Sequence, residues 1–243
     1  MSAADPDPLA GRFGATSVAP DERRQRIRDV FRLVAPRYDL MNDLMSFGIH
    51  RPWKRAFVAG LAVTPGLRAV DLAGGTGDIA RLLAARGADV TVVDPSEEML
   101  AVGRRRSPGI PAIAAEAEHL PFADASLDLV TMSFGIRNVT HMGTALAEIG
   151  RVLKPGGRFA CLEFSTPHWL IRPGYQLWSR TAIPALGALV AGKVAAYRYL
   201  IESIERFPDQ ARFAGLIRDA GFAQADWRNL SFGIAAIHVA RKA

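Results

Sequence analysis

The chain has 243 residues, and 49% of them are hydrophobic, so it can bury the core of one large domain. Its single cysteine, Cys161, excludes an internal disulfide framework and a cysteine-based metal cage. The most apolar stretch, 182–191, is shorter than the roughly 18 apolar residues of a membrane span. The net charge of +6 suits nucleic acid or an anionic membrane, but scattered arginines indicate solvated helix faces instead.

The N-terminal region divides into a tail and a helical part. Residues 1–20 are rich in Ala, Ser, Pro and Gly, and we expect a disordered tail. They lack the apolar core of a signal peptide, and acidic residues argue against a transit peptide, so we expect a cytoplasmic protein. Residues 21–35 place apolar side chains at helical spacing, with arginines on the other face. Within the helical part, 21–60, the irregular segment 37–54 fits either a lid over a pocket or a helix pair packed on the core.

From residue 68 onwards, strand patterns alternate with helical patterns. The expected strands are 68–73, 89–94, 111–115, 127–134 and 157–164, and the expected helices are 77–86, 96–105, 141–153 and 209–220. Strands separated by helices of this length form a parallel sheet with right-handed crossovers.

The C-terminal part breaks this alternation twice. The segments 224–230 and 233–240 are joined by a turn too short for a crossover, so they predict an antiparallel hairpin. Residues 165–208 predict an inserted helical cap. A parallel sheet that ends in a hairpin is more typical of methyltransferases than of dehydrogenases. The predicted fold is α/β and Rossmann-like, with a mostly parallel seven-stranded sheet in a single domain, 21–243.

The sequence AVDLAGGTGDIA, residues 69–80, is the expected first βα unit: a strand, a glycine turn and a helix. The turn matches G-x-G-x-x-A through Gly75, Gly77 and Ala80, with the acidic Asp94 about 20 residues later. Sites for dinucleotides and for S-adenosylmethionine share this pattern, so the pattern alone does not name the ligand.

Two carboxylates beside the turn favour S-adenosylmethionine. A diphosphate needs a helix N-terminus free of anions, whereas Asp71 ends the strand and Asp78 stands in the first helical turn. Both acids suit the sulfonium and ammonium groups of S-adenosylmethionine. The alternative, in which they only serve the loop and the helix start, stays open.

Further cofactor contacts are expected where the next strands end. Asp94 follows the second strand and can accept both ribose hydroxyls. Glu116, after the third strand, can accept from the adenine amino group, with the backbone N–H of Ala117 beside it. Ser133 ends the fourth strand, at the edge where ligands bind in open α/β sheets.

Two segments resemble signatures of the ubiquinone/menaquinone biosynthesis C-methyltransferase family. They are residues 38–54, YDLMNDLMSFGIHRPWK, and residues 133–140, SFGIRNVT. Residues 151–157, 197–204 and 207–210 extend the resemblance. It implies methyl transfer from S-adenosylmethionine to a ring carbon of a polyprenylated benzoquinol or naphthoquinol, and it does not distinguish the two rings.

The resemblance also implies roles for individual residues. Thr76 would contact the cofactor together with Asp94, the Glu116–Ala117 pair and Ser133, and Tyr38 would close over it. The chain departs from the family pattern twice. The family usually has Asn at the position of Glu116, and it tends to have Asn-Asp where this chain has Gly192-Lys193.

Methylation of a ring carbon requires that carbon to be electron-rich, which deprotonation of an adjacent hydroxyl achieves. A free phenol has a pKa of about 10, so the site must stabilise the phenolate or supply a base. Arg137 can hold the phenolate and Asn138 can orient the hydroxyl, unless Arg137 is only one half of an Arg–carboxylate brace. His50 is a second candidate for the base, against an ordinary packed or capping role.

The main alternative function is methylation of RNA. The Asn/Asp-Pro-Pro-aromatic motif that positions an exocyclic amine is absent after the fourth strand, where Ser133-Phe134-Gly135 stands, so nucleic acid is not an expected partner. A dinucleotide-dependent oxidoreductase is disfavoured by Asp78 and by the hairpin. No metal is expected, because the histidines lack ligand spacing.

The expected partner is a lipid quinol, reached by peripheral contact with the inner face of the cell membrane. A homodimer and a complex with other enzymes of quinone biosynthesis are left open. An apolar groove for the lipid tail would draw on Met41, Leu44, Met45, Phe47, Trp169, Trp178 and residues 182–191.

Overall fold

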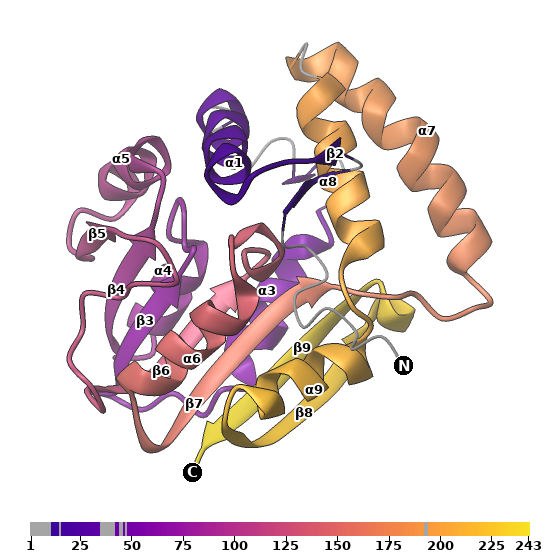
Figure 1. Ribbon diagram of the computed structural model, residues 1–243. Helices are drawn as coiled ribbons and strands as arrows, with labels where there is room; N and C mark the ends of the chain where they lie inside the picture. Colours follow the sequence, from indigo (N-terminus) through magenta and orange to yellow (C-terminus); the bar gives the residue numbers. More distant parts are fainter. Residues whose placement is uncertain (1–10, 15, 35–41, 44–45, 47, 192–193) are drawn as a thin grey trace.

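The computed structural model describes residues 11–14, 16–34, 42–43, 46, 48–191 and 194–243. Side chains are described except in 33–34, 182–191 and 194–197. The centre of this part is a seven-stranded sheet with the order β5-β4-β3-β6-β7-β9-β8 (Figure 1). Its strands are β3 (Arg68–Leu72), β4 (Asp89–Asp94), β5 (Ala112–Ala114), β6 (Leu127–Ser133), β7 (Leu153–Phe164), β8 (Phe222–Leu230) and β9 (Ala235–Lys242).

The strand directions confirm the predicted fold class. Strands β5, β4, β3, β6 and β7 pair in parallel, whereas β9 runs antiparallel to both β7 and β8. The predicted C-terminal hairpin is therefore present. Most strand boundaries differ by two residues or fewer, but β7 begins at Leu153 and not at residue 157. Its first residue, Leu153, pairs with Leu127 at the start of β6, so the strand extends through the segment between the expected helix and the expected strand.

Helices cover both faces of the sheet. They are α1 (Pro20–Val34), α3 (His50–Ala59), α4 (Asp78–Ala84), α5 (Glu97–Arg106), α6 (Met142–Val152), α7 (Arg172–Ala191), α8 (Val194–Arg206) and α9 (Gln210–Asp219), with short 3-10 turns η2 (Ile136–Asn138) and η3 (Ser231–Gly233). Side chains of β3 alternate between two buried clusters: Val70 packs with residues of α6 and α9, and Ala69 with residues of α3 and α4. This period-2 alternation is what buries both faces of the strand.

The N-terminal tail contains more structure than predicted. Strands β1 (Arg12–Phe13) and β2 (Thr16–Ser17) form a small antiparallel hairpin within the segment expected to be disordered. The Phe13 ring stacks on the Tyr199 ring of α8, with the centroids 4.3 Å apart. This contact between distant parts of the chain is invisible to local patterns in an Ala-, Ser- and Gly-rich sequence. Residues 1–10 lie outside the described part.

One arginine of α1 also departs from the prediction of a solvated face. Arg23 is only 1% exposed, and its guanidinium donates to the carbonyl oxygens of Arg12 at 2.8 Å and Arg137 at 3.1 Å, and to that of Val139. Figure 1 shows α1 above the edge where the parallel strands end, beside the α7–α8 pair. Because η2 lies at that edge, its carbonyl groups meet Arg23.

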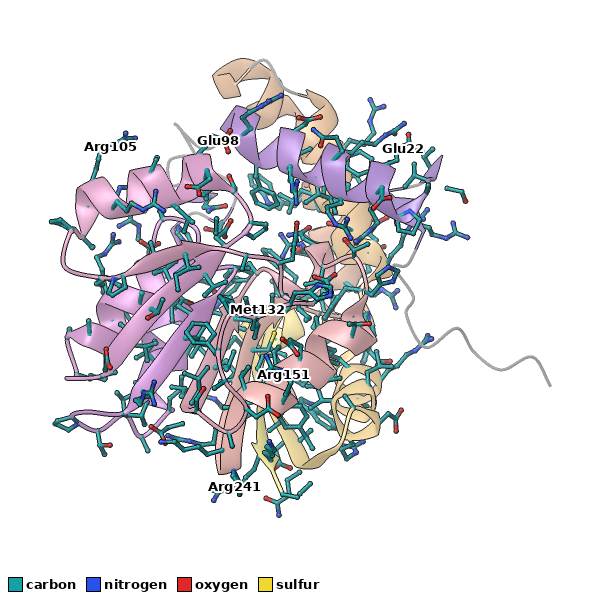
Figure 2. The ribbon with its side chains drawn as sticks, turned by 60° about the vertical axis from the view of Figure 1, so that its left-hand side comes forward. Glu22, Glu98, Arg105, Met132, Arg151 and Arg241 are labelled. Carbon is teal, nitrogen blue, oxygen red and sulfur yellow. The ribbon has the colours of Figure 1, made fainter. Side chains whose placement is uncertain are left out.

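Other charges do lie on the outside, as the scattered arginines indicated. Figure 2 shows Glu22, Arg105 and Arg241 pointing away from the molecule, whereas Met132 lies inside it.

The segment predicted as a helical cap contains α7 and α8, which pack against each other. Among the helices of the described residues, none combines the length and the hydropathy of a transmembrane span.

Candidate active site

The glycine turn between β3 and α4 is organised by one buried carboxylate. Asp71 is fully buried; the Ala80 N–H donates to its Oδ2 at 3.0 Å, and the Thr131 hydroxyl donates to its Oδ1 at 3.1 Å. Asp71 thereby joins the end of β3 to β6 and to the first turn of α4. Gly77 precedes α4 with φ of +80°, a conformation that glycine adopts without strain.

The two acids at the turn carry less free negative charge than the sequence suggested. Burial raises the pKa of Asp71 to about 7. Asp78 accepts from Lys54 Nζ at 2.7 Å and pairs with Arg81. Burial raises the pKa of Asp78, but these cations outweigh it and keep the pKa below its usual range. Asp71 and Asp78 therefore do serve the loop and the start of α4, which was the alternative to a direct role in binding the cofactor.

Asp94 ties the glycine turn to the end of β4. The Gly75 N–H donates to Asp94 Oδ2 and the Ser96 N–H donates to Oδ1, each at 2.9 Å. Burial raises the pKa of Asp94 to about 6. Each carboxylate oxygen accepts more than one hydrogen bond, so capacity remains for ligand hydroxyls.

Helix α1 contacts the residue expected at the adenine. Glu116 pairs with Arg28, and Arg24 Nε lies 3.9 Å from its Oε1. Both arginines line the same pocket as Glu116. Glu116 therefore connects α1 to the wall of the pocket through these arginines.

Most residues predicted to bind the cofactor line one pocket, which crosses the carboxyl ends of β3, β4 and β6. They are Asp71, Gly75, Thr76, Asp94, Glu116, Ala117 and Ser133. Gly77 does not line it, and Tyr38 lies outside the described residues. The Ser133 hydroxyl is buried and has no hydrogen-bond partner in the described part of the chain. An unpaired buried hydroxyl on a pocket wall fits a polar ligand.

A second pocket of about 550 Å³ lies beside the first and shares Lys54 and Phe134 with it. Its lining includes residues of α3, η2, β7, α7 and α8 and the residue that follows β6, and several of them are aromatic. The aromatic residues that line it are Trp53, Phe134, Phe164, Tyr175 and Trp178. Such walls suit a flat apolar ring.

His50 enters this second pocket from the start of α3. Its Nε2 lies 2.8 Å from Asp43 Oδ1, and its Nδ1 is buried with no partner among the described residues. Burial lowers the pKa of His50, and the Asp43 carboxylate only partly opposes that shift. Arg51 holds Asp43 in turn, with hydrogen bonds of 2.7 and 2.6 Å.

Arg137 lies in the same pocket and is braced by a carboxylate. Its Nη1 donates to Glu163 Oε1 at 2.6 Å and to the Phe134 carbonyl at 2.8 Å, and its guanidinium lies 5.5 Å from the Phe164 ring centroid. Burial raises the pKa of Glu163, and Arg137 opposes the shift. Sequence reasoning missed Glu163, although an acidic residue inside the apolar strand β7 was a signal for it.

Asn138 follows Arg137 directly in η2 but does not line the second pocket. It lines the first pocket, and its Oδ1 accepts from the Tyr199 hydroxyl at 3.0 Å. The structure therefore brings His50 and Arg137 together in the second pocket and places Asn138 on the cofactor side. Of the residues predicted to form the lid, the apolar candidates Met41, Leu44, Met45 and Phe47 lie outside the described part.

The fold and the first pocket define an S-adenosylmethionine-dependent methyltransferase. A solved methyltransferase of this class from Thermotoga maritima has the same fold, with a TM-score of 0.64 at 22% identity over 89% of this chain and 100% of that one. The match to the ubiE/COQ5 methyltransferase family extends over residues 19–242, and the chain belongs to this family.

Curated relatives agree over nearly the whole length. The ubiquinone/menaquinone biosynthesis C-methyltransferase UbiE of Rubrivivax gelatinosus is 60% identical, covering 98% of this chain and 96% of that protein. The protein of the same name from Acidiphilium cryptum is 52% identical, covering 93% of this chain and 94% of that protein. The chain is thus an enzyme with S-adenosylmethionine as its cofactor, and the RNA alternative is not favoured.

Asp71 should make the stability of the cofactor-free protein depend on pH. Its pKa is about 7 in the folded state against 3.8 when unfolded, so folding takes up a proton between these values. The stabilisation is complete below about pH 4 and is lost as pH rises through about 7, by as much as about 4 kcal/mol. In Asp71→Asn the amide oxygen can accept from the Ala80 N–H and the amide nitrogen can donate to the Thr131 hydroxyl, which turns to the Val70 carbonyl, so both contacts remain while the titrating group is lost. This variant should flatten that part of the pH dependence of the unfolding free energy, measured by urea unfolding from about pH 4 to 8.

Asp128→Asn is the matched control, because the pKa of Asp128 is lowered by Lys154 and by the Arg68 amide despite partial burial. Removing the Asp128 carboxylate should change the pH dependence of the unfolding free energy only at the acidic end. If the unfolding free energies of wild type and Asp71→Asn depended on pH in the same way, the proton uptake assigned to Asp71 would be contradicted.

Proposed function

We propose that this enzyme transfers the methyl group of S-adenosylmethionine to a ring carbon of a polyprenylated quinol in ubiquinone and menaquinone biosynthesis. The observation that carries the proposal is the junction of the two pockets at Lys54 and Phe134. A quinol ring between the aromatic walls would meet the methyl donor at this junction. The names of the relatives support the same reaction.

The cofactor fits the first pocket through contacts that its walls offer. Asp94 would accept the ribose hydroxyls, Glu116 and the Ala117 N–H would bind adenine, and the unpaired Ser133 hydroxyl would complete the polar set. The bound sulfonium supplies an electrophilic methyl group. Thr76, which is buried in the glycine turn, would contact the same ligand.

His50 is the better placed base for the quinol hydroxyl. If Nε2–H donates to Asp43, then Nδ1 carries a lone pair, and the lowered pKa keeps the ring neutral at pH 7. A guanidinium does not serve as a base at this pH. In this scheme the hydroxyl proton passes to His50 Nδ1, and the developing negative charge spreads to the ortho carbon that attacks the methyl group. The sulfur–methyl bond breaks as the carbon–methyl bond forms, so S-adenosylhomocysteine leaves. The methylated ring carbon then loses its hydrogen as a proton, which restores the aromatic quinol.

Arg137 would hold the developing oxyanion. Its Nε is buried and has no partner among the described residues, while Nη1 is occupied by Glu163 and the Phe134 carbonyl. A fixed donor in a dry pocket stabilises negative charge more than water does. Asn138, in contact with the cofactor pocket, would fix the position of η2 through Tyr199.

An exposed apolar surface beside the second pocket supports peripheral docking on an anionic bilayer. Trp169, Leu170 and Leu177 are 74%, 69% and 67% exposed, and α7 also supplies Tyr175 and Trp178 to the pocket wall. Arg172 is exposed on the same helix. A lipid quinol could thus enter from the membrane while its ring reaches the pocket.

A labelling assay tests the reaction. Purified protein with methyl-labelled S-adenosylmethionine should label a demethylated benzoquinol, a demethylmenaquinol or both, and should leave bulk RNA unlabelled. Label in RNA alone would overturn the proposal. A ratio between the two quinols would assign the ring preference.

Arg137→Met should lower turnover by about 100- to 1,000-fold while cofactor affinity changes little, because the lost donor acts on the oxyanion. It also leaves Glu163 buried without its partner, which costs about 3–5 kcal/mol. The double variant Arg137→Met/Glu163→Gln removes that charge and should recover stability but not turnover. Turnover that returns with stability would show that Arg137 is only a brace.

Liposome co-sedimentation tests the docking surface. Wild type should bind anionic vesicles at low salt, and Trp169→Ser/Leu177→Ser should reduce the bound fraction several-fold. Trp227→Ser, at an exposed tryptophan on β8, is the control and should bind normally. If wild type does not bind the vesicles, the proposal is contradicted. If the protein instead self-associates or captures another quinone-biosynthesis enzyme through this surface, the surface belongs to those partners and not to the membrane.

A further inference from the structure

Lys54 lies at the boundary between the two pockets, and the functions assigned above do not use it. Its side chain is 12% exposed on α3 and lines both pockets. The ammonium lies 2.7 Å from Asp78 Oδ2, while Arg81 holds Oδ1 of the same carboxylate. A lysine and an aspartate thus lie side by side on the wall of the cofactor pocket, next to the place where the methyl group must leave.

The position of this pair follows from the shape of the cofactor. Its sulfur carries three substituents: the adenosyl group, the transferred methyl group and the amino-acid chain. Asp94 and Glu116 would hold the adenosyl group, and the methyl group must face the second pocket. The amino-acid chain starts at the same sulfur, so it extends within the end of the pocket that Lys54 and Asp78 line.

The charges of the pair match those of an α-amino acid. Its carboxylate needs a cation and its ammonium group needs an anion. Among the described residues that line this pocket, the other cations are Arg24 and Arg28, and both lie at Glu116. An ammonium has three donors and each carboxylate oxygen accepts more than one bond, so Lys54 and Asp78 can bind a ligand without separating.

We propose that Lys54 and Asp78 form the subsite for the amino-acid end of S-adenosylmethionine, with Lys54 on the carboxylate and Asp78 on the ammonium group. This inference rests on the cofactor placement proposed above. The subsite fixes the sulfur at the junction of the two pockets, so it controls where the methyl group is presented to the ring.

The test compares two ligands that differ only at the amino-acid end. S-adenosylhomocysteine carries it, and 5′-methylthioadenosine lacks it, while both are uncharged at sulfur. Calorimetric titration of Lys54→Met should show about a 10- to 100-fold weaker affinity for S-adenosylhomocysteine, as expected for the loss of a charge-assisted hydrogen bond. The affinity for 5′-methylthioadenosine should stay within about twofold of wild type.

Lys154→Met is the matched control, because Lys154 Nζ forms an equivalent ion pair with Asp128 Oδ1 at 2.6 Å and lines neither pocket. It should leave both affinities unchanged. If Lys54→Met weakened the affinity for both ligands equally, the proposed subsite would be overturned. An unchanged affinity for S-adenosylhomocysteine together with lost turnover would overturn it as well. Wild type that binds S-adenosylhomocysteine but methylates no quinol would refute the proposed substrate and leave the subsite standing.

Discussion

The carboxylate of Asp71, buried where β3 ends, connects the parts of the molecule on which the site depends. It receives the Ala80 amide of α4 and the Thr131 hydroxyl of β6, so one side chain joins the first βα unit to the neighbouring strand at the point where the sheet order reverses. A Cβ at Gly74 would lie 2.7 Å from this carboxylate, so the turn can pass over it only with glycine there. Open α/β sheets bind ligands at such a reversal.

Around this point, buried charges are paired across elements. Arg23 of α1 binds carbonyl groups of η2, and Arg137 of η2 binds Glu163 of β7. Removing either partner of a buried pair leaves an uncompensated charge, which is strongly unfavourable. The N-terminal helix is therefore part of the architecture of the site, since its arginine holds the turn that presents Arg137 to the second pocket.

Much of the fold and of the cofactor site was predictable from local patterns. The alternation of apolar residues placed the strands, and the carboxyl ends of parallel strands share one edge, so Asp94, Glu116 and Ser133 were expected to converge and do line one pocket. The prediction failed where long-range packing overrides composition. The β1–β2 hairpin packs on α8 through the Phe13–Tyr199 stack, and Arg23 is buried although Glu22 beside it on α1 is exposed.

By itself, the sequence determined the α/β class, the C-terminal hairpin, the glycine turn and the two signature segments, because each is encoded in residues close together in the chain. The tertiary structure decided which charges meet. Lys54 pairs with Asp78, Arg137 with Glu163 and Arg28 with Glu116, across separations of 24, 26 and 88 residues. No local periodicity specifies such pairs, since they form only when packing brings separate elements to the same edge of the sheet.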